Sequence, residues 1–304
     1  MAAVATGIAP GTRVKMGPSE LEFGRTIEEL RDSNDLLGDR DALRQRLQDD
    51  GYLLLRGLQD RAAVLRGRMD ILRFAAEKQM LDPAAPLEEG RVAPEKRGAM
   101  VPQDVVHRMA NFMGVVNSPA IMGFFARFLA GDVVTFDYKW LRIVPTGGFT
   151  GAHYDIVYMG RGTKSLYTCW TPFDDVTLEK GPICLCLGSQ HFEKIKQTYG
   201  QMDVDRDKVR GWFSSDPLEV NAKFGGRWAT TEFRAGDVLI FGMYLMHGSL
   251  INATPYYRIS SDTRYQLASE PTDERWVGKQ PIGHYAWHQG EGVDMAAARA
   301  RWGV

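Results

Sequence analysis

Gly151-Ala152-His153-Tyr154-Asp155 is the stretch of this 304-residue chain that says most about its fold and chemistry. A second stretch, residues 236–258, contains His247 and Arg258. Side chains two residues apart on a strand point to the same face, so His153 and Asp155 can share one metal ion if they lie on a strand or at its end. Two imidazoles and one carboxylate on one face of an iron ion leave its other positions free for chemistry. The order His-x-Asp, His, Arg therefore predicts a metal centre shared by distant strands.

The composition is that of an ordinary globular protein, with 44% hydrophobic and 25% charged residues. A chain of this length can bury a full core in one large domain. The net charge of −1, with no dense run of Lys and Arg, argues against a nucleic-acid partner. No apolar stretch approaches the roughly 20 residues of a membrane helix, and the N-terminus lacks the basic region of a secretory signal. We therefore expect a small-molecule substrate and no membrane partner.

The chain has three cysteines, Cys169, Cys184 and Cys186. This odd, low count argues against a disulfide framework and fits a reducing compartment, so we expect a cytoplasmic protein. Cys184 and Cys186 alternate within the apolar run 183–187 and share one face of a predicted strand. A Cys-x-Cys metal site is one interpretation, but small apolar packing is the favoured one.

The N-terminal part of the chain has mainly helical spacing. Residues 26–50 and 60–80 have the periodicity of amphipathic helices, and 52–56 is a short apolar strand candidate. The Pro- and Gly-containing segment 82–102 predicts a loop. A further helix is predicted from Pro119 to Leu129, because proline is favoured in a first helical turn.

From about residue 133 the pattern changes to short β-prone runs separated by Gly, Pro, Asp and Asn. The predicted strands are 133–144, 166–173, 183–187, 227–233, 238–241 and 256–267. Many short strands with turn residues between them predict an antiparallel sandwich or barrel. We expect one mainly β domain with flanking helices (α+β). Its expected parts are a loose N-terminal tail (1–20) and a single domain (21–304), divided into a helical part (about 21–130), a β core (about 131–268) with a polar insertion (190–226), and a C-terminal tail (269–304).

With these motifs in place, the chain resembles the phytanoyl-CoA dioxygenase family of iron(II)/2-oxoglutarate-dependent oxygenases. The matching pieces are His153-Tyr154-Asp155, Cys169-Trp170-Thr171-Pro172 ahead of Gly181, Gly188-Ser189-Gln190-His191, Gly236-Asp237, His247-Gly248-Ser249 and Arg258. The resemblance covers about residues 50–270 and is strongest from 138 onward. Its combined spacing is specific, whereas no single piece is. The implied fold is a double-stranded β-helix (a cupin-like jelly roll) with iron at its open end.

The resemblance also implies roles for individual residues. His153, Asp155 and His247 correspond to the iron ligands. Arg258 corresponds to the partner of the distal carboxylate of 2-oxoglutarate, with Ser249 as a second contact.

Two tryptophans are implied in the co-substrate site. Trp170 matches a family position that lines it, and Trp140 matches another through a looser alignment. A lysine that the family contributes from its N-terminal half has no clear counterpart here, and Lys96, Arg97 and His107 are only candidates.

The activity implied is oxidation of a small organic molecule by dioxygen, with 2-oxoglutarate decarboxylated to succinate and CO2. Hydroxylation is the default outcome, and desaturation, epoxidation and ring formation are variants. Halogenating relatives usually lack the carboxylate ligand, so the presence of Asp155 argues against halogenation. One alternative is a metal-dependent hydrolase or isomerase on the same fold, because fold alone does not fix chemistry. A second is a catalytically silent binding protein. The pairing of Arg258 with Ser249 argues against the first, and the intact triad argues against the second.

Several other polar residues near these motifs have more ordinary interpretations. Arg264 lies an even number of residues from Arg258, so it shares that strand face and is a rival for the carboxylate of the co-substrate. Arg258 is favoured by its spacing from His247, and Arg264 is interpreted as structural or at the rim. Arg161 and Lys164 follow the metal motif and would suit an acidic substrate group, although solvated loop charges are the favoured interpretation. Tyr158 is expected to border the substrate.

The remaining histidines and the insertion complete the set of hypotheses. His284 and His288 have the spacing of a helical zinc pair but no recognisable third ligand, so packing or surface histidines are favoured. His191 is interpreted as structural. Long loops at an open barrel end often gate access, so 190–226 is hypothesised to be a lid.

Overall fold

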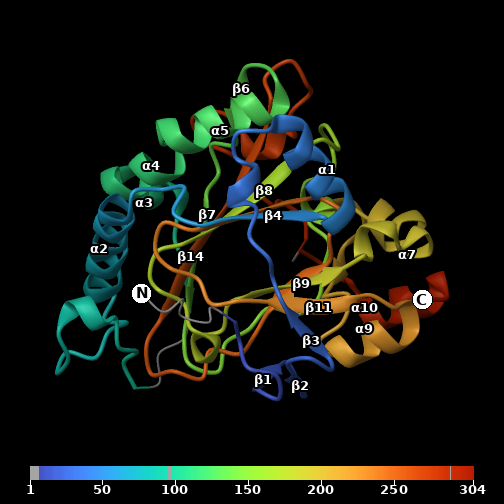
Figure 1. The fold of residues 1–304 in the computed structure, drawn as a ribbon, viewed down its shortest axis with the longest axis horizontal. Helices are drawn as coiled ribbons and strands as arrows, with labels where there is room; N and C mark the ends of the chain where they lie inside the picture. Colours follow the sequence, from blue (N-terminus) through green and yellow to red (C-terminus); the bar gives the residue numbers. More distant parts are fainter. Residues whose placement is uncertain (1–6, 95–97, 288) are drawn as a thin grey trace.

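A computed structural model describes residues 7–94, 98–287 and 289–304. The larger of its two main sheets is antiparallel throughout, in the strand order β4-β12-β8-β14-β7-β5, with β6 also paired to β14 (Figure 1). Its strands are β4 (Tyr52–Leu55), β5 (Ala99–Met100), β6 (Val133–Thr135), β7 (Trp140–Val144), β8 (Tyr167–Pro172), β12 (Val238–Gly242) and β14 (Arg258–Leu267).

The smaller sheet has the order β13-β9-β11-β3. Its strands are β3 (Ile27–Glu29), β9 (Ile183–Leu187), β11 (Arg227–Thr230) and β13 (His247–Ser249). Strand β3 is parallel to β11, and the other pairs are antiparallel. A β-bridge between His153 and His247 attaches the segment before residue 156 to the edge of this sheet.

Apolar residues fill the space between the two sheets because each strand points alternate side chains inward. Leu54, Trp170 and Leu239 of the larger sheet pack with Leu185 and Ala229 of the smaller one. Each of these side chains is almost fully removed from water. Burying one leucine contributes about 1.5–3 kcal/mol, so this shared core holds the two sheets together.

Helices cover the outer face of the larger sheet, where the opposite set of strand residues points (Figure 1). Helices α1 (Arg40–Asp50) and α5 (Pro119–Leu129) pack on the β4–β12–β8 side, and α2 (Arg61–Glu77) and α4 (Ala110–Val116) pack on β7 and β14. Helix α5 has the predicted bounds, because the Ser118 side chain caps its first turn and Ala130 ends it in a left-handed conformation. The short elements on this side are η1 (Asn34–Leu36), η2 (Leu87–Glu89) and α3 (Gln103–Arg108).

The insertion 190–226 and the C-terminus form a second packed layer around the smaller sheet. Its elements are η4 (Ser189–His191), α7 (Glu193–Gln197), η5 (Tyr199–Gln201), α8 (Val204–Asp207), β10 (Val209–Arg210), α9 (Pro217–Phe224), β15 (Val293–Asp294) and α10 (Met295–Trp302). Strands β10 and β15 pair, and buried Tyr199, Phe213 and Val220 join the core. The insertion is therefore a folded layer, rather than the loose polar loop that its composition suggests. The remaining elements are β1 (Arg13–Met16), β2 (Ser19–Glu22), α6 (Ile156–Met159), η3 (Leu178–Lys180) and η6 (Glu274–Trp276).

Three expectations about the elements were wrong. Residues 13–22 form the hairpin β1–β2 and bury Val14 and Met16, so the tail predicted for 1–20 is not loose from residue 13 onward. The helix predicted from residue 26 begins only at Arg40, where Asp39 caps it, and 27–29 is a strand. The single strand predicted for 133–144 is two strands, β6 and β7, separated at residues 136–139.

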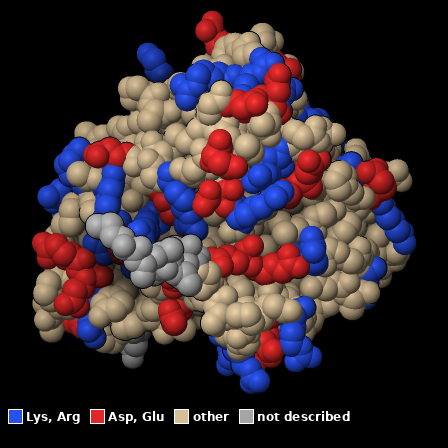
Figure 2. Space-filling model, viewed as in Figure 1, with Lys and Arg blue, Asp and Glu red and all other residues tan. Residues whose placement is uncertain are grey.

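The segment Ala110–Leu129 corrects a fourth expectation, because it is long and apolar enough to cross a membrane by composition. It consists of α4 and α5, which are separated at Asn117-Ser118, and its Phe112 and Phe125 pack in the core. Core helices pass the same test of length and composition, so this finding is weak evidence for a span. Figure 2 shows basic and acidic side chains interspersed on the face drawn, as the net charge of −1 suggests.

Candidate metal centre

The structure brings His153, Asp155 and His247 together at one end of the space between the sheets. His153 and His247 exchange two backbone hydrogen bonds of 3.0 Å each, which place their rings 4.2 Å apart. Asp155 has helical backbone angles and directly precedes α6, and its Oδ1 faces both imidazoles. One candidate ligand atom from each residue lies within 4.8 Å of the others, and all three residues are buried. The sequence-based grouping of these three residues is confirmed in space.

Backbone carbonyls orient both imidazoles. Nδ1 of His153 lies 2.9 Å from the Gly151 carbonyl oxygen, and Nδ1 of His247 lies 3.0 Å from the Leu245 carbonyl oxygen. Because a carbonyl only accepts, each Nδ1 carries the proton and each Nε2 keeps a free lone pair. The two Nε2 atoms lie 3.9 Å and 3.8 Å from Oδ1 of Asp155. Two neutral nitrogens and one carboxylate oxygen therefore converge, which fits an iron(II) ion bound on one face.

Burial and mutual charge keep the three groups in the protonation states that a metal needs. Burial, followed by the neighbouring His247, lowers the pKa of His153 to about 3, and burial also lowers the pKa of His247. Burial alone would raise the pKa of Asp155, but Arg264, the two histidines and the Thr168 hydroxyl together lower it below its ordinary range. At neutral pH the site is thus two imidazoles and one carboxylate, without protons to displace.

Gly248 allows the strand that carries His247 to lie close to the segment that precedes His153. A Cβ atom on Gly248 would lie 2.6 Å from the Thr150 carbonyl oxygen. This is closer than any side chain tolerates, so only glycine fits here without moving the backbone. The His-Gly-Ser sequence therefore has a packing reason as well as a chemical one.

A cavity adjoins the triad and contains most of the other residues expected in the co-substrate site. It is lined by Arg142, Thr150, His153, Trp170, Ile183, His247, Gly248, Ser249, Arg258 and Asp262. Ser249 accepts a 3.0 Å hydrogen bond from the Thr150 amide and keeps its own O–H for a further acceptor. The indole of Trp170 packs on Phe233 and forms an apolar wall.

Arg258 is a buried cation in this cavity with unused hydrogen-bonding capacity. Its Nη1 donates to the Ser260 hydroxyl at 3.2 Å, and its Nε is buried without a partner. Burial, followed by repulsion from Arg142, lowers the pKa of Arg258 to about 10. A guanidinium N–H without a partner in a cavity can donate a hydrogen bond to a carboxylate. Arg258 and Ser249 therefore suit the distal carboxylate of 2-oxoglutarate.

Trp140 lies elsewhere than expected. It is absent from the cavity lining and packs behind the triad, with the Arg264 guanidinium carbon 4.7 Å from its ring centre. Its other face contacts Trp276 at a ring separation of 4.7 Å. Trp140 is therefore separated from the cavity, and it contacts Arg264 where the alignment had predicted a contact with the co-substrate. Arg264 is structural, as expected, but it is fully buried and contacts Asp155 instead of lying at a rim.

Arg142 and Asp262 are cavity residues that sequence reasoning missed. They form an ion pair across β7 and β14, and about a third of the Arg142 side chain remains exposed. The sequence offered one signal for them. Arg142 lies two residues after Trp140, and Asp262 lies two residues before Arg264, so each shares a strand face with a residue already considered. That signal became readable only when the strand register was known, since it pairs Arg142 with Ser260.

The other candidates that the structure describes do not reach the metal centre. Nε2 of His107 bonds to the Asp137 carbonyl, and His191 is exposed in a short turn. Cys184 and Cys186 are free and buried, and in the described part of the chain they belong to no metal-binding group. Lys96, Arg97 and His288 lie outside the described residues.

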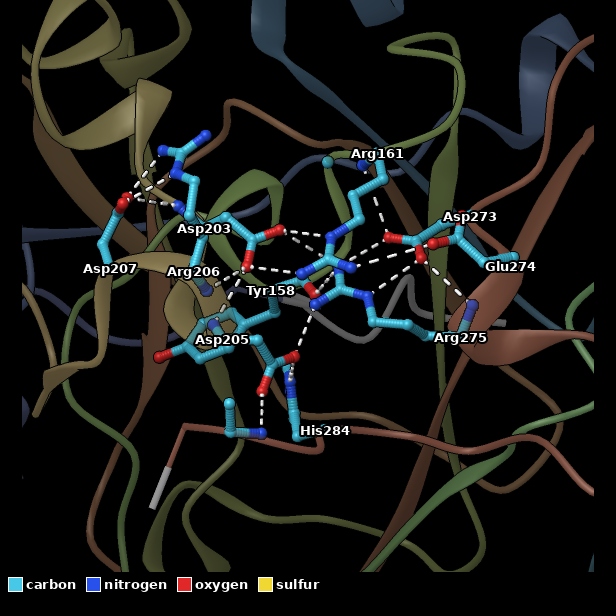
Figure 3. A network of polar contacts seen from close by, with 12 residues as sticks. Tyr158, Arg161, Asp203, Asp205, Arg206, Asp207, Asp273, Glu274, Arg275 and His284 are labelled. Atoms are coloured by element: carbon cyan, nitrogen blue, oxygen red, sulfur yellow. Dashed lines mark hydrogen bonds and ion pairs between the residues drawn. The ribbon is translucent and has the colours of Figure 1, made fainter. Parts of the chain in front are cut away.

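The loop that follows the metal motif is tied into a buried ionic network (Figure 3). Arg161 binds Asp203 at 2.7 Å and the Tyr285 hydroxyl at 3.0 Å, and the Lys164 amine donates to the Gly160 carbonyl. Arg161 is therefore already paired with a carboxylate, whereas the Lys164 amine is bonded to a neutral carbonyl. Nδ1 of His284 bonds to Asp205 at 3.0 Å, which makes it a packing histidine as expected.

Tyr158 connects this network to the metal centre. Its ring lies edge-on to His153 at 5.6 Å and also contacts His284 and Trp287 at 5.9 Å and 5.3 Å. Its carbonyl accepts a hydrogen bond from Arg275. The C-terminal segment thus forms a wall next to the first histidine of the triad.

Comparisons with known proteins agree with this geometry. The family model of phytanoyl-CoA dioxygenase (PhyH) matches residues 47–260. The 1-deoxypentalenic acid 11-beta-hydroxylase of Streptomyces exfoliatus is 27% identical over 258 residues, which cover 80% of this chain and 87% of that protein.

Two solved structures show the fold. The non-haem alpha-ketoglutarate-dependent carbocyclase SnoK from nogalamycin biosynthesis has a TM-score of 0.55 at 16% identity, covering 86% of this chain and 98% of its own. EctD from S. alaskensis, solved with 2-oxoglutarate and 5-hydroxyectoine, has a TM-score of 0.52 at 19% identity, covering 94% and 93%. The expected cupin-like oxygenase fold is confirmed. Because the family match spans well over half of the sequence and the triad fits iron(II), this chain belongs to the phytanoyl-CoA dioxygenase family and is an iron(II)/2-oxoglutarate-dependent dioxygenase.

Proposed function

We propose that the enzyme hydroxylates a small, largely apolar organic molecule that bears a carboxylate. The observation that carries this proposal is the second arginine of the cavity. Arg142 and Arg258 both line it, and Asp262 is the acidic side chain facing them. One arginine suffices for the distal carboxylate of 2-oxoglutarate. Arg142 is paired with Asp262 through Nε, but about a third of its side chain is exposed, so it can also bind a second anion. The hydroxylase of Streptomyces exfoliatus is itself named for an acid substrate, which supports the same choice.

Each residue of the site has one task in this scheme. His153, Asp155 and His247 hold iron(II), which when bound supplies dioxygen activation coupled to decarboxylation of 2-oxoglutarate. Arg258 binds the distal carboxylate of the co-substrate, and the Ser249 hydroxyl donates to it. Trp170 excludes water from one side of the cavity. Arg142, steered by Asp262, orients the substrate through its carboxylate.

A substrate screen tests the acid requirement. Succinate release and product mass are measured with polycyclic apolar carboxylic acids and with their methyl esters. The acids should give succinate and a product heavier by one oxygen, and the esters should react at least about tenfold more slowly, because they lack the carboxylate that Arg142 would bind. Arg142→Met should abolish this preference. Equal rates with acids and esters would contradict the proposed anchoring role of Arg142.

We also propose a cytoplasmic location, supported by three free and buried cysteines. Fractionation of the producing cells with thiol trapping tests it. Recovery of the protein outside the cytoplasmic fraction would contradict it.

A further inference from the structure

The carboxylate of Asp155 has two differently surrounded oxygens. Oδ1 faces both imidazoles, at 3.9 Å and 3.8 Å from their Nε2 atoms. Oδ2 points the other way and accepts hydrogen bonds from Nη2 of Arg264 at 3.0 Å and from the Thr168 hydroxyl at 2.5 Å. The protein therefore already uses one oxygen of this ligand and leaves the other for the metal.

The two donors are fixed by sheet register. Arg264 and Thr168 are directly paired residues on β14 and β8, so both point to the same face at the same height. Both are almost completely buried. A slip of β14 by one residue against β8 would leave Thr168 in place but turn Arg264 to the opposite face, away from Asp155.

A second layer of contacts immobilises the Arg264 guanidinium. Its Nε lies 3.0 Å from the Met159 sulfur, and its central carbon lies 4.7 Å from the centre of the Trp140 ring, which packs on Trp276. A buried cation over an indole is stabilised by the negative face of the aromatic ring. Trp140 therefore supports Arg264, which explains why it is buried behind the triad.

We propose that Arg264 and Thr168 are positioning residues that keep Asp155 a one-oxygen ligand of the iron. The proposal rests on the iron/2-oxoglutarate function described above. A six-coordinate ion with two histidines and one carboxylate oxygen keeps three positions, two for 2-oxoglutarate and one for dioxygen. If both carboxylate oxygens bound the metal, the co-substrate would fill the remaining positions and dioxygen would have none. By binding Oδ2, Arg264 and Thr168 would keep one coordination position of the metal available for dioxygen.

The test counts metal-bound water, which reports coordination without turnover. Manganese(II) replaces iron, and the water-proton relaxation rate is measured for the binary complex and after 2-oxoglutarate is added. The variants are Thr168→Val, which removes only a hydroxyl, and Arg264→Lys, which keeps the charge but loses the planar fork. Thr171→Val is the matched control, because it lies on the same strand with its side chain on the opposite face.

Wild type and Thr171→Val should retain one exchangeable water in the ternary complex. Thr168→Val and Arg264→Lys should lose one water relative to wild type in the binary and the ternary complex, while manganese affinity changes less than about tenfold. In the iron enzyme, kcat should fall by about 10- to 100-fold, with the KM for 2-oxoglutarate almost unchanged.

Wild-type water counts in both variants would overturn the inference, whatever their activity. If Arg264→Lys does not fold, Thr168→Val decides alone. Failure of the proposed function has a different signature, in which 2-oxoglutarate leaves the relaxation of wild type unchanged. In that case the binary complexes still show whether Asp155 has become bidentate.

Discussion

Arg258 is the residue on which co-substrate binding depends, because it is the buried cation with an orphaned donor in the cavity. We predict that Arg258→Ala weakens 2-oxoglutarate binding about 10²- to 10³-fold, since a charge-assisted bidentate pair is lost. Anaerobic titration of the iron(II) protein measures this, and iron affinity should be retained. Arg61→Ala, at an exposed pair with Asp175, is the control and should have no effect. Unchanged 2-oxoglutarate affinity in Arg258→Ala would show that another cation holds the co-substrate.

At the residue scale, the sequence was most informative where chemistry restricts the residue type. His153, Asp155 and His247 were identifiable because a metal centre requires two imidazoles and a carboxylate that can converge, although Asp155 has helical backbone angles and not those of a strand. Arg264 and Trp140 could not be placed in the same way. Whether a residue lies at an odd or even position of a strand gives the face of the sheet to which its side chain points, but not which residues it contacts there. Only the register of β14 against β8 and β7 shows that Arg264 contacts Asp155.

At the scale of elements, α8 clamps the C-terminal segment through one carboxylate. Oδ1 of Asp205 accepts the backbone N–H groups of residues 285–287, and Oδ2 binds Arg275 and His284 (Figure 3). We predict that Asp205→Asn lowers the free energy of unfolding by about 2–4 kcal/mol, because buried Arg275 loses one counter-charge. Urea unfolding measures it, and trypsin should cut after Lys279 faster.

Asp104→Asn is the control for this clamp, because Asp104 forms an exposed pair with Arg108 on one helix. It should change stability by less than about 0.5 kcal/mol. Equal stability of Asp205→Asn and wild type would show that the clamp is replaceable by neutral hydrogen bonds.

Helices α9 and α10 are joined by an ion pair whose strength depends on pH. Arg299, then the Ser214 hydroxyl, lower the pKa of Glu219 from its ordinary 4.5 to about 2. Because the pKa of Glu219 is lower in the folded than in the unfolded state, its carboxylate stabilises the fold at pH values above about 4.5. This stabilisation is lost as the pH falls from about 4.5 to 2. We predict that Glu219→Gln costs about 1–2 kcal/mol at pH 7, and that this difference disappears near pH 2. Chemical unfolding at several pH values measures it, and a difference independent of pH would contradict the prediction.

Most elements of the β core were predictable, and the departures have a common cause. Strand β9 and helix α5 have their predicted bounds because apolar runs and caps mark both ends. Residues 27–29 and 190–226 differ from the prediction because tertiary contacts determine their conformation. Pairing of β3 with β11 overrides a helical periodicity, and polar segments fold when their few apolar residues reach the core.

At the scale of the whole molecule, the two sheets must stay packed together for Arg264 and Thr168 of the larger sheet to reach Asp155 beside the smaller one. Leu54 is fully buried between them. We predict that Leu54→Ala lowers the free energy of unfolding by about 2–5 kcal/mol through lost burial and a residual cavity. Ile282→Ala is the control, because Ile282 is 64% exposed and should change stability by less than about 0.5 kcal/mol. Denaturant unfolding decides, and equal effects would mean that the inter-sheet core is not tightly packed.

The fold class and the metal centre were thus accessible from sequence, whereas the cavity residue Arg142 and the C-terminal wall were not. Arg142 has no motif around it and is identified by the cavity alone. The wall depends on contacts between residues more than 100 positions apart, such as Tyr158 with His284 and Trp287. Spacing along a chain contains no information on such pairs.

The central claim is that His153, Asp155 and His247 bind iron(II) in a form that accepts 2-oxoglutarate. The most direct measurement is an anaerobic titration of the metal-free protein with iron(II) and then 2-oxoglutarate, followed in the visible region. A metal-to-ligand charge-transfer band should appear only when both are present and should be absent in a folded His247→Ala variant. A folded wild-type protein that binds iron and shows no band with 2-oxoglutarate would contradict the co-substrate assignment.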